Sequence, residues 1–346
     1  MDDKIRVGIG GLGRSGWNIH AEIFEALSDK YQVTAVSDPI EERRREAVAR
    51  FGCKSYPEFE HLIKDVDIDL VVVATPSHLH ASHTIMALES GKNVVCEKPM
   101  AISLSEADRM IEASERTGNI LVIFQNSLFA PDYLKVKEVI LSGKLGRIIL
   151  VKIYNHTFSR RWDWQTLRKF GGGELRNNGV HLIAQALEII GDKEPEVFCD
   201  LQRALTLGDA EDHVKILLKA PNSPLIDIEM TRACAYPQDK WLVMGTRGGL
   251  TGTSSSLKWK YFNPETLPPR ELEVEPTPDR SYNFESIPWF EEEWRLSEPY
   301  QSSGILFYKE LYKTLRYGAP PPVPLNLARK IMWVVEKCFE ISKLAC

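Results

Sequence analysis

The first 125 residues repeat one pattern, in which a short apolar segment is followed by a longer charged segment. The apolar segments read IRVGIGG, VTAVSD, IDLVVVATP, KNVVCEKP and NILVIFQN, and the charged segments between them favour helices. The run LVVVA is apolar at every position, which is typical of a parallel strand buried on both faces. Strands and helices that alternate in this way predict a doubly wound, parallel α/β domain.

The first apolar segment runs directly into GLGRSG, which comprises Gly11, Leu12, Gly13, Arg14, Ser15 and Gly16. Glycines at this spacing, between a strand and a helix, permit a tight turn and close approach of the backbone to a pyrophosphate. Asp38 ends the next strand, where a carboxylate can bind the ribose hydroxyls of a dinucleotide. These features predict a Rossmann domain with NAD as cofactor, because a carboxylate repels the 2′-phosphate of NADP. Ser37 and the arginines at 43–45 leave NADP open.

A second stretch, residues 71–111, resembles a family of oxidoreductases. It has Thr75-Pro76 at the end of one strand, His80 soon after, and Glu97-Lys98-Pro99 at the end of the next strand. Together with the glycine turn before it and a GGG…G-H segment after it, this order resembles the Gfo/Idh/MocA oxidoreductases. The family is named after glucose–fructose oxidoreductase and inositol dehydrogenase.

The resemblance implies a second, α+β domain with a large, open, mostly antiparallel sheet, and assembly into homodimers or homotetramers. It implies hydride transfer between NAD(P) and a hydroxyl or carbonyl carbon of a sugar, polyol or related compound. It places Thr75, Pro76, His80, Glu97 and Lys98 at the cofactor. Lys98 would also lie beside the reacting oxygen, where an ammonium stabilises a developing alkoxide or relays a proton.

The segment KFGGGELRNNGVHLI leads into an apolar helix, and His181 lies opposite that helix's apolar face. Its triple glycine lets the backbone closely approach a neighbouring molecule, as the wall of a cleft lined by a cofactor requires. In the resembled family an aspartate and a histidine four residues apart act with the lysine in proton transfer. Asn177 replaces that aspartate here, and Ala184 replaces a later one. We therefore expect Asn177 to orient a catalytic His181, with a substrate-binding or purely structural His181 as alternatives.

Three further side chains are candidates for binding the substrate. Asn126 follows the last strand of the first domain, although the arginines that often follow it in the family are absent. Trp162 and Trp164 lie in a segment of aromatic and hydrogen-bonding residues, which suits the apolar faces and hydroxyl edges of a sugar. For each tryptophan a place in the core is an equally good interpretation.

We expect a domain boundary at residue 125, with residues 126–346 forming the substrate-binding and oligomerisation domain. The segments HVKILLKA, LIDIEMTRA and KWLVMGTRGGLTGT predict its antiparallel strands. Residues 264–299 lack periodicity and predict an irregular excursion over the surface or across a subunit contact. The final helix is expected to pack back on the first domain.

The composition excludes several classes of partner. A net charge of −5 gives no reason to expect nucleic acid, and no segment is apolar enough for a membrane span or a secretory signal. Six scattered cysteines indicate reduced thiols and a cytoplasmic protein. His78, His80 and His83 lack the companion ligands of a metal motif, so we expect no metal.

The leading hypothesis is an NAD(P)-dependent dehydrogenase or reductase that acts on CH–OH groups of a sugar or polyol, with Lys98 and His181 serving proton transfer. Two alternatives remain. One is an enzyme that cleaves glycosides by cycling a tightly held NAD. The other is a nucleotide-binding sensor or scaffold without turnover, which the two missing aspartates would explain.

Overall fold

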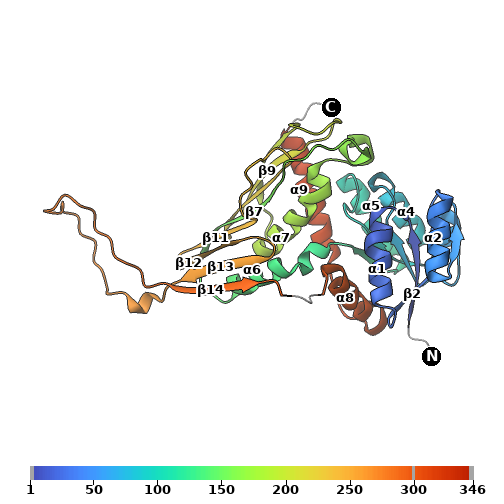
Figure 1. The fold of residues 1–346 in the computed structure, drawn as a ribbon, viewed down its shortest axis with the longest axis horizontal. Helices are drawn as coiled ribbons and strands as arrows, with labels where there is room; N and C mark the ends of the chain where they lie inside the picture. The colour runs from blue at the N-terminus through green and yellow to red at the C-terminus, as the bar shows by residue number, and fades with distance from the viewer. Residues whose placement is uncertain (1–3, 298–300, 343–346) are drawn as a thin grey trace.

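The computed structural model describes residues 4–297 and 301–342, which form two sheets joined by a helical core (Figure 1). The first sheet is parallel and has the strand order β3-β2-β1-β4-β5-β6. Its strands are β1 (Ile5–Gly10), β2 (Tyr31–Ser37), β3 (Lys54–Tyr56), β4 (Leu70–Val73), β5 (Asn93–Cys96) and β6 (Leu121–Ile123). This order reverses direction between β1 and β4, and in such sheets ligands bind at that switch point.

Helices connect these strands in the predicted alternation. They are η1 (Gly16–Ala21) running into α1 (Glu22–Ala26), α2 (Glu41–Phe51), α3 (Phe59–Ile63), η2 (Ser77–Leu79) with α4 (His80–Glu89), and α5 (Leu104–Thr117). All four residues of β4 are buried, as expected of a strand covered on both faces. The short edge strand β3 was not predicted, because its three residues include a lysine and a serine and lack an apolar run.

The second sheet has eight strands in the order β14-β13-β12-β11-β7-β10-β9-β8. They are β7 (Ile148–His156), β8 (Glu196–Gln202), β9 (His213–Lys219), β10 (Leu225–Thr231), β11 (Trp241–Gly245), β12 (Gly248–Gly252), β13 (Ser256–Tyr261) and β14 (Phe290–Arg295). Only the β7–β10 pair among these is parallel. The predicted fold class, a doubly wound parallel sheet plus a mostly antiparallel open sheet, is confirmed.

Helices lie on the face of this sheet that is turned toward the first sheet (Figure 1). They include α6 (Pro131–Leu141), α7 (Val180–Ile190) and α9 (Leu325–Ser342), while η3 (Asn126–Phe129) precedes α6 and η6 (Leu175–Gly179) runs into α7. The segment between β13 and β14 leaves the body as a long extended arm, and its one assigned element is the short turn η7 (Pro264–Thr266). The remaining short helices, η4 (Trp164–Thr166) and η5 (Arg168–Phe170), precede the triple glycine.

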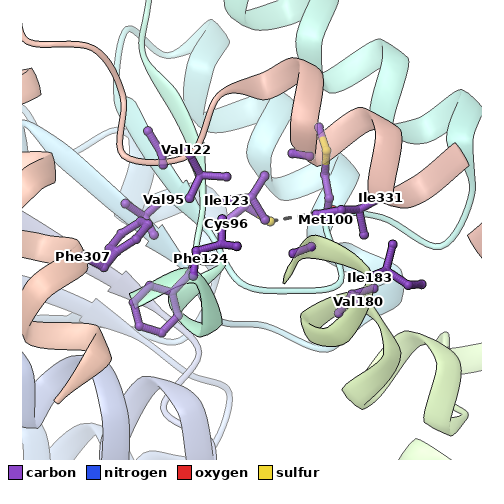
Figure 2. Close-up of a cluster of buried hydrophobic side chains, with 14 of the residues drawn as sticks. Val95, Cys96, Met100, Val122, Ile123, Phe124, Val180, Ile183, Phe307 and Ile331 are labelled. Atoms are coloured by element: carbon purple, nitrogen blue, oxygen red, sulfur yellow. Dashed lines mark hydrogen bonds between the residues drawn. The ribbon is translucent and has the colours of Figure 1, made fainter. Parts of the chain in front are cut away.

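The last two helices return to the first 125 residues. Helix α8 (Ser303–Tyr317) contacts α1 and η3, and α9 contacts α5 and β6. Figure 2 shows the buried side chains that join here from β5, β6, α7, α8 and α9, among them Val95, Ile123, Ile183, Phe307 and Ile331. Because the core is continuous across residue 125, the predicted division into two domains stays a prediction.

Candidate active site

The glycine turn between β1 and η1 has the geometry that a phosphate-binding turn needs. Gly11 has a φ of +92°, and a Cβ added there would lie 2.6 Å from the carbonyl oxygen of Ala74. A Cβ on Gly16 would lie 1.9 Å from the carbonyl oxygen of Gly11, so the helix start packs directly on the turn. A Cβ on Gly13 would meet no atom within 4 Å, and its face opens into a cleft. The turn therefore leaves room for a pyrophosphate against bare backbone.

Asp38 is fixed at the end of β2, close to this turn. It is 4% exposed, and its carboxylate accepts hydrogen bonds from the backbone N–H groups of Leu12 (2.8 Å) and Ile40 (2.9 Å). The guanidinium of Arg43 lies 3.4 Å from the same carboxylate. Leu12 itself is buried, so it contributes its backbone rather than its side chain. The carboxylate is thus held at the place where a dinucleotide presents an adenosine ribose.

A cleft of about 710 Å³ runs from this turn toward the second sheet. Its lining includes most of the predicted cofactor residues, namely Gly11, Gly13, Arg14, Ser15, Asp38, Thr75, Pro76, His80, Glu97 and Lys98. The opposite wall comes from Arg161, Asp163, Trp164 and Gln165. Its size matches a small-molecule or cofactor site.

His80 ties two loops of the cleft together. Its 2%-exposed ring contacts the backbone carbonyl of Pro99 through Nδ1 (2.7 Å) and that of Thr75 through Nε2 (2.8 Å). The Lys98–Pro99 peptide bond is cis. Burial lowers the pKa of His80, while its contacts with the two backbone carbonyls raise it. The structure therefore assigns His80 to holding the Thr75-Pro76 and Glu97-Lys98-Pro99 loops in place.

Lys98 lines the cleft. Its Nζ donates a hydrogen bond to the backbone carbonyl of Asn177 at 2.8 Å. Burial lowers the pKa of Lys98; Arg14 and Arg161 lower it further, and Glu97 opposes them. A lysine whose pKa is lowered gives up its proton more readily, which favours a role in acid–base chemistry.

Asn177 contacts other groups than the sequence suggested. Its backbone carbonyl binds Lys98, while its side-chain amide donates to the carbonyl of Gln165 at 3.3 Å. Nδ1 of His181 has no hydrogen-bond partner within the described residues. The prediction that Asn177 orients the imidazole is therefore not what this structure shows, because the carboxamide is directed to the opposite wall of the cleft.

His181 is the second residue of α7, a helix that is largely buried. Burial, then the nearby charge of Lys98, lowers the pKa of His181 to about 3, so the ring is neutral at physiological pH. Ala184, one turn later, is fully buried in the core and adds no polar group to the site. A neutral imidazole has one ring nitrogen that can accept a hydrogen bond and one that can donate.

The triple glycine serves internal packing, which corrects its interpretation as a cleft wall. A Cβ on Gly171 would meet Ile102, and one on Gly172 would meet the carbonyl of Gln165. A Cβ on Gly173 would lie 2.1 Å from Oε1 of Glu211. The close neighbours of these glycines are therefore parts of the protein, although they position the helix that carries Asn177 and His181.

The predicted substrate residues lie at different distances from the cleft. Trp164 is 41% exposed and lines it, whereas Trp162 is 76% exposed and is not part of the lining. Asn126 begins η3 and, like His181, is outside the lining of the cleft. Trp164 is the member of this group that the geometry favours as a substrate contact.

Three buried residues near the site were missed by sequence reasoning. His20 and Tyr308 form a hydrogen-bonded chain to Glu97, with His20 Nδ1 to Tyr308 Oη at 2.8 Å and His20 Nε2 to Glu97 Oε1 at 3.1 Å. Glu211 lies behind the triple glycine, and its Oε1 accepts from the N–H of Leu175 at 3.1 Å. These contacts join residues that are 36 to 288 positions apart, so no local pattern could have indicated them.

No group of histidine, cysteine or acidic side chains in the described residues could hold a metal ion. Within the same part of the chain, no helix has the length and apolar character to cross a membrane.

Comparison with known proteins agrees with this geometry. Residues 5–125 match the profile of the GFO_IDH_MocA family, described as "Oxidoreductase family, NAD-binding Rossmann fold". Residues 133–251 match the "GFO/IDH/MocA C-terminal domain". The two matched segments together span more than half of the chain.

Individual relatives match over nearly the whole length. "Myo-inositol 2-dehydrogenase" of Thermotoga maritima is 27% identical over 326 residues, which covers 92% of this chain and 90% of that protein. "scyllo-inositol 2-dehydrogenase (NADP(+)) IolW" of Bacillus subtilis is 25% identical, with coverage of 99% and 94%. The solved structure of an NAD-binding protein from Listeria innocua superposes with a TM-score of 0.80 at 26% identity, with coverage of 98% and 95%.

Proposed function

Because the chain belongs to the Gfo/Idh/MocA family of NAD-binding oxidoreductases, we propose that it interconverts a hydroxyl and a carbonyl group on a sugar or polyol. The predicted family, the nicotinamide cofactor and the oxidoreductase function are confirmed at the level of the family. Support for a polyol substrate comes from the relatives named as inositol dehydrogenases, which the chain matches almost end to end. The predicted site residues, which follow, are our proposal.

The residues of the cleft fit NAD. Gly13 offers open space for the pyrophosphate, and the fixed carboxylate of Asp38 accepts hydrogen bonds from the adenosine ribose. Glu97 lies where it can contact the second ribose. NAD supplies the hydride acceptor when bound. We propose NAD as the preferred cofactor because Asp38 repels a 2′-phosphate, with Arg43 at 3.4 Å as the group that would have to turn outward to accept NADP.

Lys98 carries the proposal. Its half-buried side chain lines the cleft, and desolvation lowers its pKa. In our scheme Nζ of Lys98 stabilises the alkoxide that develops when the substrate hydroxyl loses its proton. Lys98 in its neutral form accepts that proton, and the neutral ring of His181 is proposed to bind the neighbouring hydroxyl. Trp164 on the opposite wall offers a flat apolar surface to the sugar ring.

The test is a turnover assay with matched variants. Purified protein and NAD are mixed with myo-inositol, scyllo-inositol and pools of sugars, and NADH absorbance is followed. Lys98→Met is expected to lower kcat by roughly 10²–10⁴-fold, the size of a general acid–base contribution, while NAD binding persists. Trp162→Phe, which changes an exposed side chain outside the cleft, is the control and should keep full activity. Equal kcat in Lys98→Met and the native protein would refute the assignment.

A second candidate function is a nucleotide-binding protein without turnover. The observation that favours it is the carboxamide of Asn177, which replaces the family aspartate and is turned to Gln165. Tight NAD binding with no NADH from any pool would support this candidate. Replacing Asn177 by Asp distinguishes the two, because in a working dehydrogenase it changes an existing rate, whereas in a retired site it creates one.

We further propose a homo-oligomer in the cytoplasm. The arm at residues 262–289 exposes Leu272 (89%), Val274 (79%), Tyr282 (92%) and Phe284 (91%), which a second copy of the chain would cover. Cytoplasmic location is supported by the free thiols at the described cysteines. Light scattering on the native protein and on a variant with residues 266–286 replaced by a short turn tests the assembly. A native monomer would refute it.

A further inference from the structure

We propose that His20 and Tyr308 are positioning residues for the reaction, which hold the Glu97 carboxylate ionised beside Lys98. This inference rests on the proposed role of Lys98. Neither residue lines the cleft, and each acts through its neighbour. The chain of contacts runs from Tyr308 through His20 to Glu97, and from Glu97 to Lys98.

Burial and the ionised carboxylate of Glu97 fix the direction of the hydrogen bond between His20 and Glu97. His20 and Tyr308 are 0% exposed, and Glu97 is 4% exposed. An ionised carboxylate only accepts, so Nε2 of His20 must carry the hydrogen that reaches Glu97 Oε1 at 3.1 Å. Nδ1 of a neutral ring is then an acceptor, and the hydroxyl of Tyr308 donates to it at 2.8 Å. The hydroxyl of Tyr308 therefore selects the tautomer of His20 that serves Glu97.

The second oxygen of Glu97 completes the link to the lysine. Oε2 accepts a hydrogen bond from the backbone N–H of Lys98 at 2.9 Å. Burial on its own would raise the pKa of Glu97, but His20 and Lys98 lower it to about 2. The carboxylate is thus charged at all physiological pH values, and its charge raises the pKa of Lys98 against the opposing effect of burial.

The aromatic surroundings hold the chain rigid. Tyr308 is brought to the first domain by α8, and its ring lies 4.7 Å from that of Phe24. The ring of His20 lies 4.5 Å from that of Phe124. Tyr31 donates from its hydroxyl to the backbone carbonyl of Tyr308 at 2.8 Å, so it anchors α8 without touching His20. These contacts fix the position of the Tyr308 ring, and with it the position of the hydroxyl oxygen beside His20.

Several charged groups affect the pKa of Lys98. Their effects must be separated from the effect of the hydrogen bonds that link Tyr308, His20 and Glu97. Glu97 and Glu174 raise the pKa of Lys98, while Arg14 and Arg161 lower it. His181 lies close enough for Lys98 to lower its pKa, and it is neutral at the pH of the assay. Variants of Tyr308 leave all five of these groups in place.

Tyr308→Phe is the variant that tests the proposal, and Tyr31→Phe is its matched control. Both remove one buried hydroxyl from the same aromatic cluster, and only the first removes the donor to His20. In Tyr308→Phe, Nδ1 of His20 loses its partner, so the ring is held less firmly in the orientation that donates to Glu97. In the pH profile of kcat, we expect the limb that reports Lys98 to move to lower pH by about half to one pH unit. kcat should fall roughly tenfold and KM for NAD by less than about twofold, while Tyr31→Phe keeps the native profile.

A rescue experiment separates positioning from loss of structure. His20→Gln retains an N–H that can reach Glu97, and it should restore a native-like limb that His20→Ala lacks. Identical profiles in Tyr308→Phe and Tyr31→Phe, or in His20→Gln and His20→Ala, would overturn the proposal.

A readout without turnover keeps this test independent of the proposed function. Competitive acetylation of lysines across a pH series, followed by mass spectrometry of the Lys98 peptide, gives the pKa of Lys98 directly. A lower Lys98 pKa in Tyr308→Phe than in Tyr31→Phe supports the positioning role of Tyr308 and His20, even if no substrate is turned over. Equal values refute it, whatever the activity assay shows.

Discussion

Replacing Glu211 by Gln should make the protein more stable at alkaline pH. Glu211 is 1% exposed, and its Oε2 has no partner in the described part of the chain. Burial raises the pKa of Glu211 from 4.5 to about 7, although Arg176 and Arg168 act in the opposite direction. The folded protein therefore binds a proton on Glu211 that the unfolded chain has already released.

The size of the effect follows from that shift. Between pH 4.5 and pH 7 the folded state holds more protons on this group than the unfolded state, so the free energy of unfolding falls as the pH rises. The rise of the pKa from 4.5 to about 7 corresponds to about 3 kcal/mol. Above pH 7 the free energy of unfolding is lower by this whole amount than it is below pH 4.5. Gln cannot ionise, and its carbonyl can still accept from the N–H of Leu175 that Glu211 now binds.

Urea unfolding at pH 4 and at pH 8.5 measures this difference. We expect Glu211→Gln to match the native protein at pH 4 within about 1 kcal/mol and to exceed it by about 3 kcal/mol at pH 8.5. Glu46→Gln, an exposed change on α2, is the control for removal of a negative charge. A Glu211→Gln variant whose stability runs parallel to that of the native protein across this pH range would show that the carboxyl is not desolvated as the structure indicates.

Three other changes have expected outcomes that standard assays can check. Gly16→Ala places a methyl group 1.9 Å from the carbonyl of Gly11, so we expect loss of NAD binding by calorimetry and a lower Tm; unchanged NAD affinity would contradict the packing argument. Asp38→Asn removes the repelling charge, and the ratio of NAD to NADP affinity should fall by about tenfold or more in a fluorescence titration; a constant ratio would contradict the assignment. Trp241→Phe deletes the 2.8 Å hydrogen bond to buried Asp132 and should cost about 1–3 kcal/mol in urea unfolding, where no loss would contradict it.

The sequence predicts best what is decided within about one strand and one helix. The parallel sheet follows from apolar runs such as that of β4, and the glycine turn follows from sterics that involve adjacent residues. Helix α7 (Val180–Ile190) begins and ends where the apolar periodicity and Gly191 predict. Each of these features depends on residues that lie close together in the sequence. The motifs that resemble the family lie in the same short segments.

Contacts between distant segments could not be predicted in this way. Tyr308 reaches His20 across 288 positions because α8 returns to the first sheet, and nothing near either residue indicates the partner. The triple glycine was assigned to the cleft, yet Glu211, whose position follows from the second sheet, occupies the space beside Gly173. For the arm between β13 and β14 the sequence predicts only an irregular excursion. The segment lacks periodicity, so nothing in it indicates the direction in which the arm leaves the sheet.

The replacement of the family aspartate by Asn177 shows why a side-chain pattern can misjudge a site. The contact that Asn177 makes with Lys98 uses the backbone carbonyl, which any residue at this position would supply. The negative charge that supports a protonated Lys98 comes instead from Glu97 and Glu174. Glu174 is itself buried and paired with Arg232, and Glu97 is charged because His20 donates to it. The electrostatic support of the lysine therefore lies on the cofactor side of the cleft and at the helix start, and it does not require an aspartate at position 177.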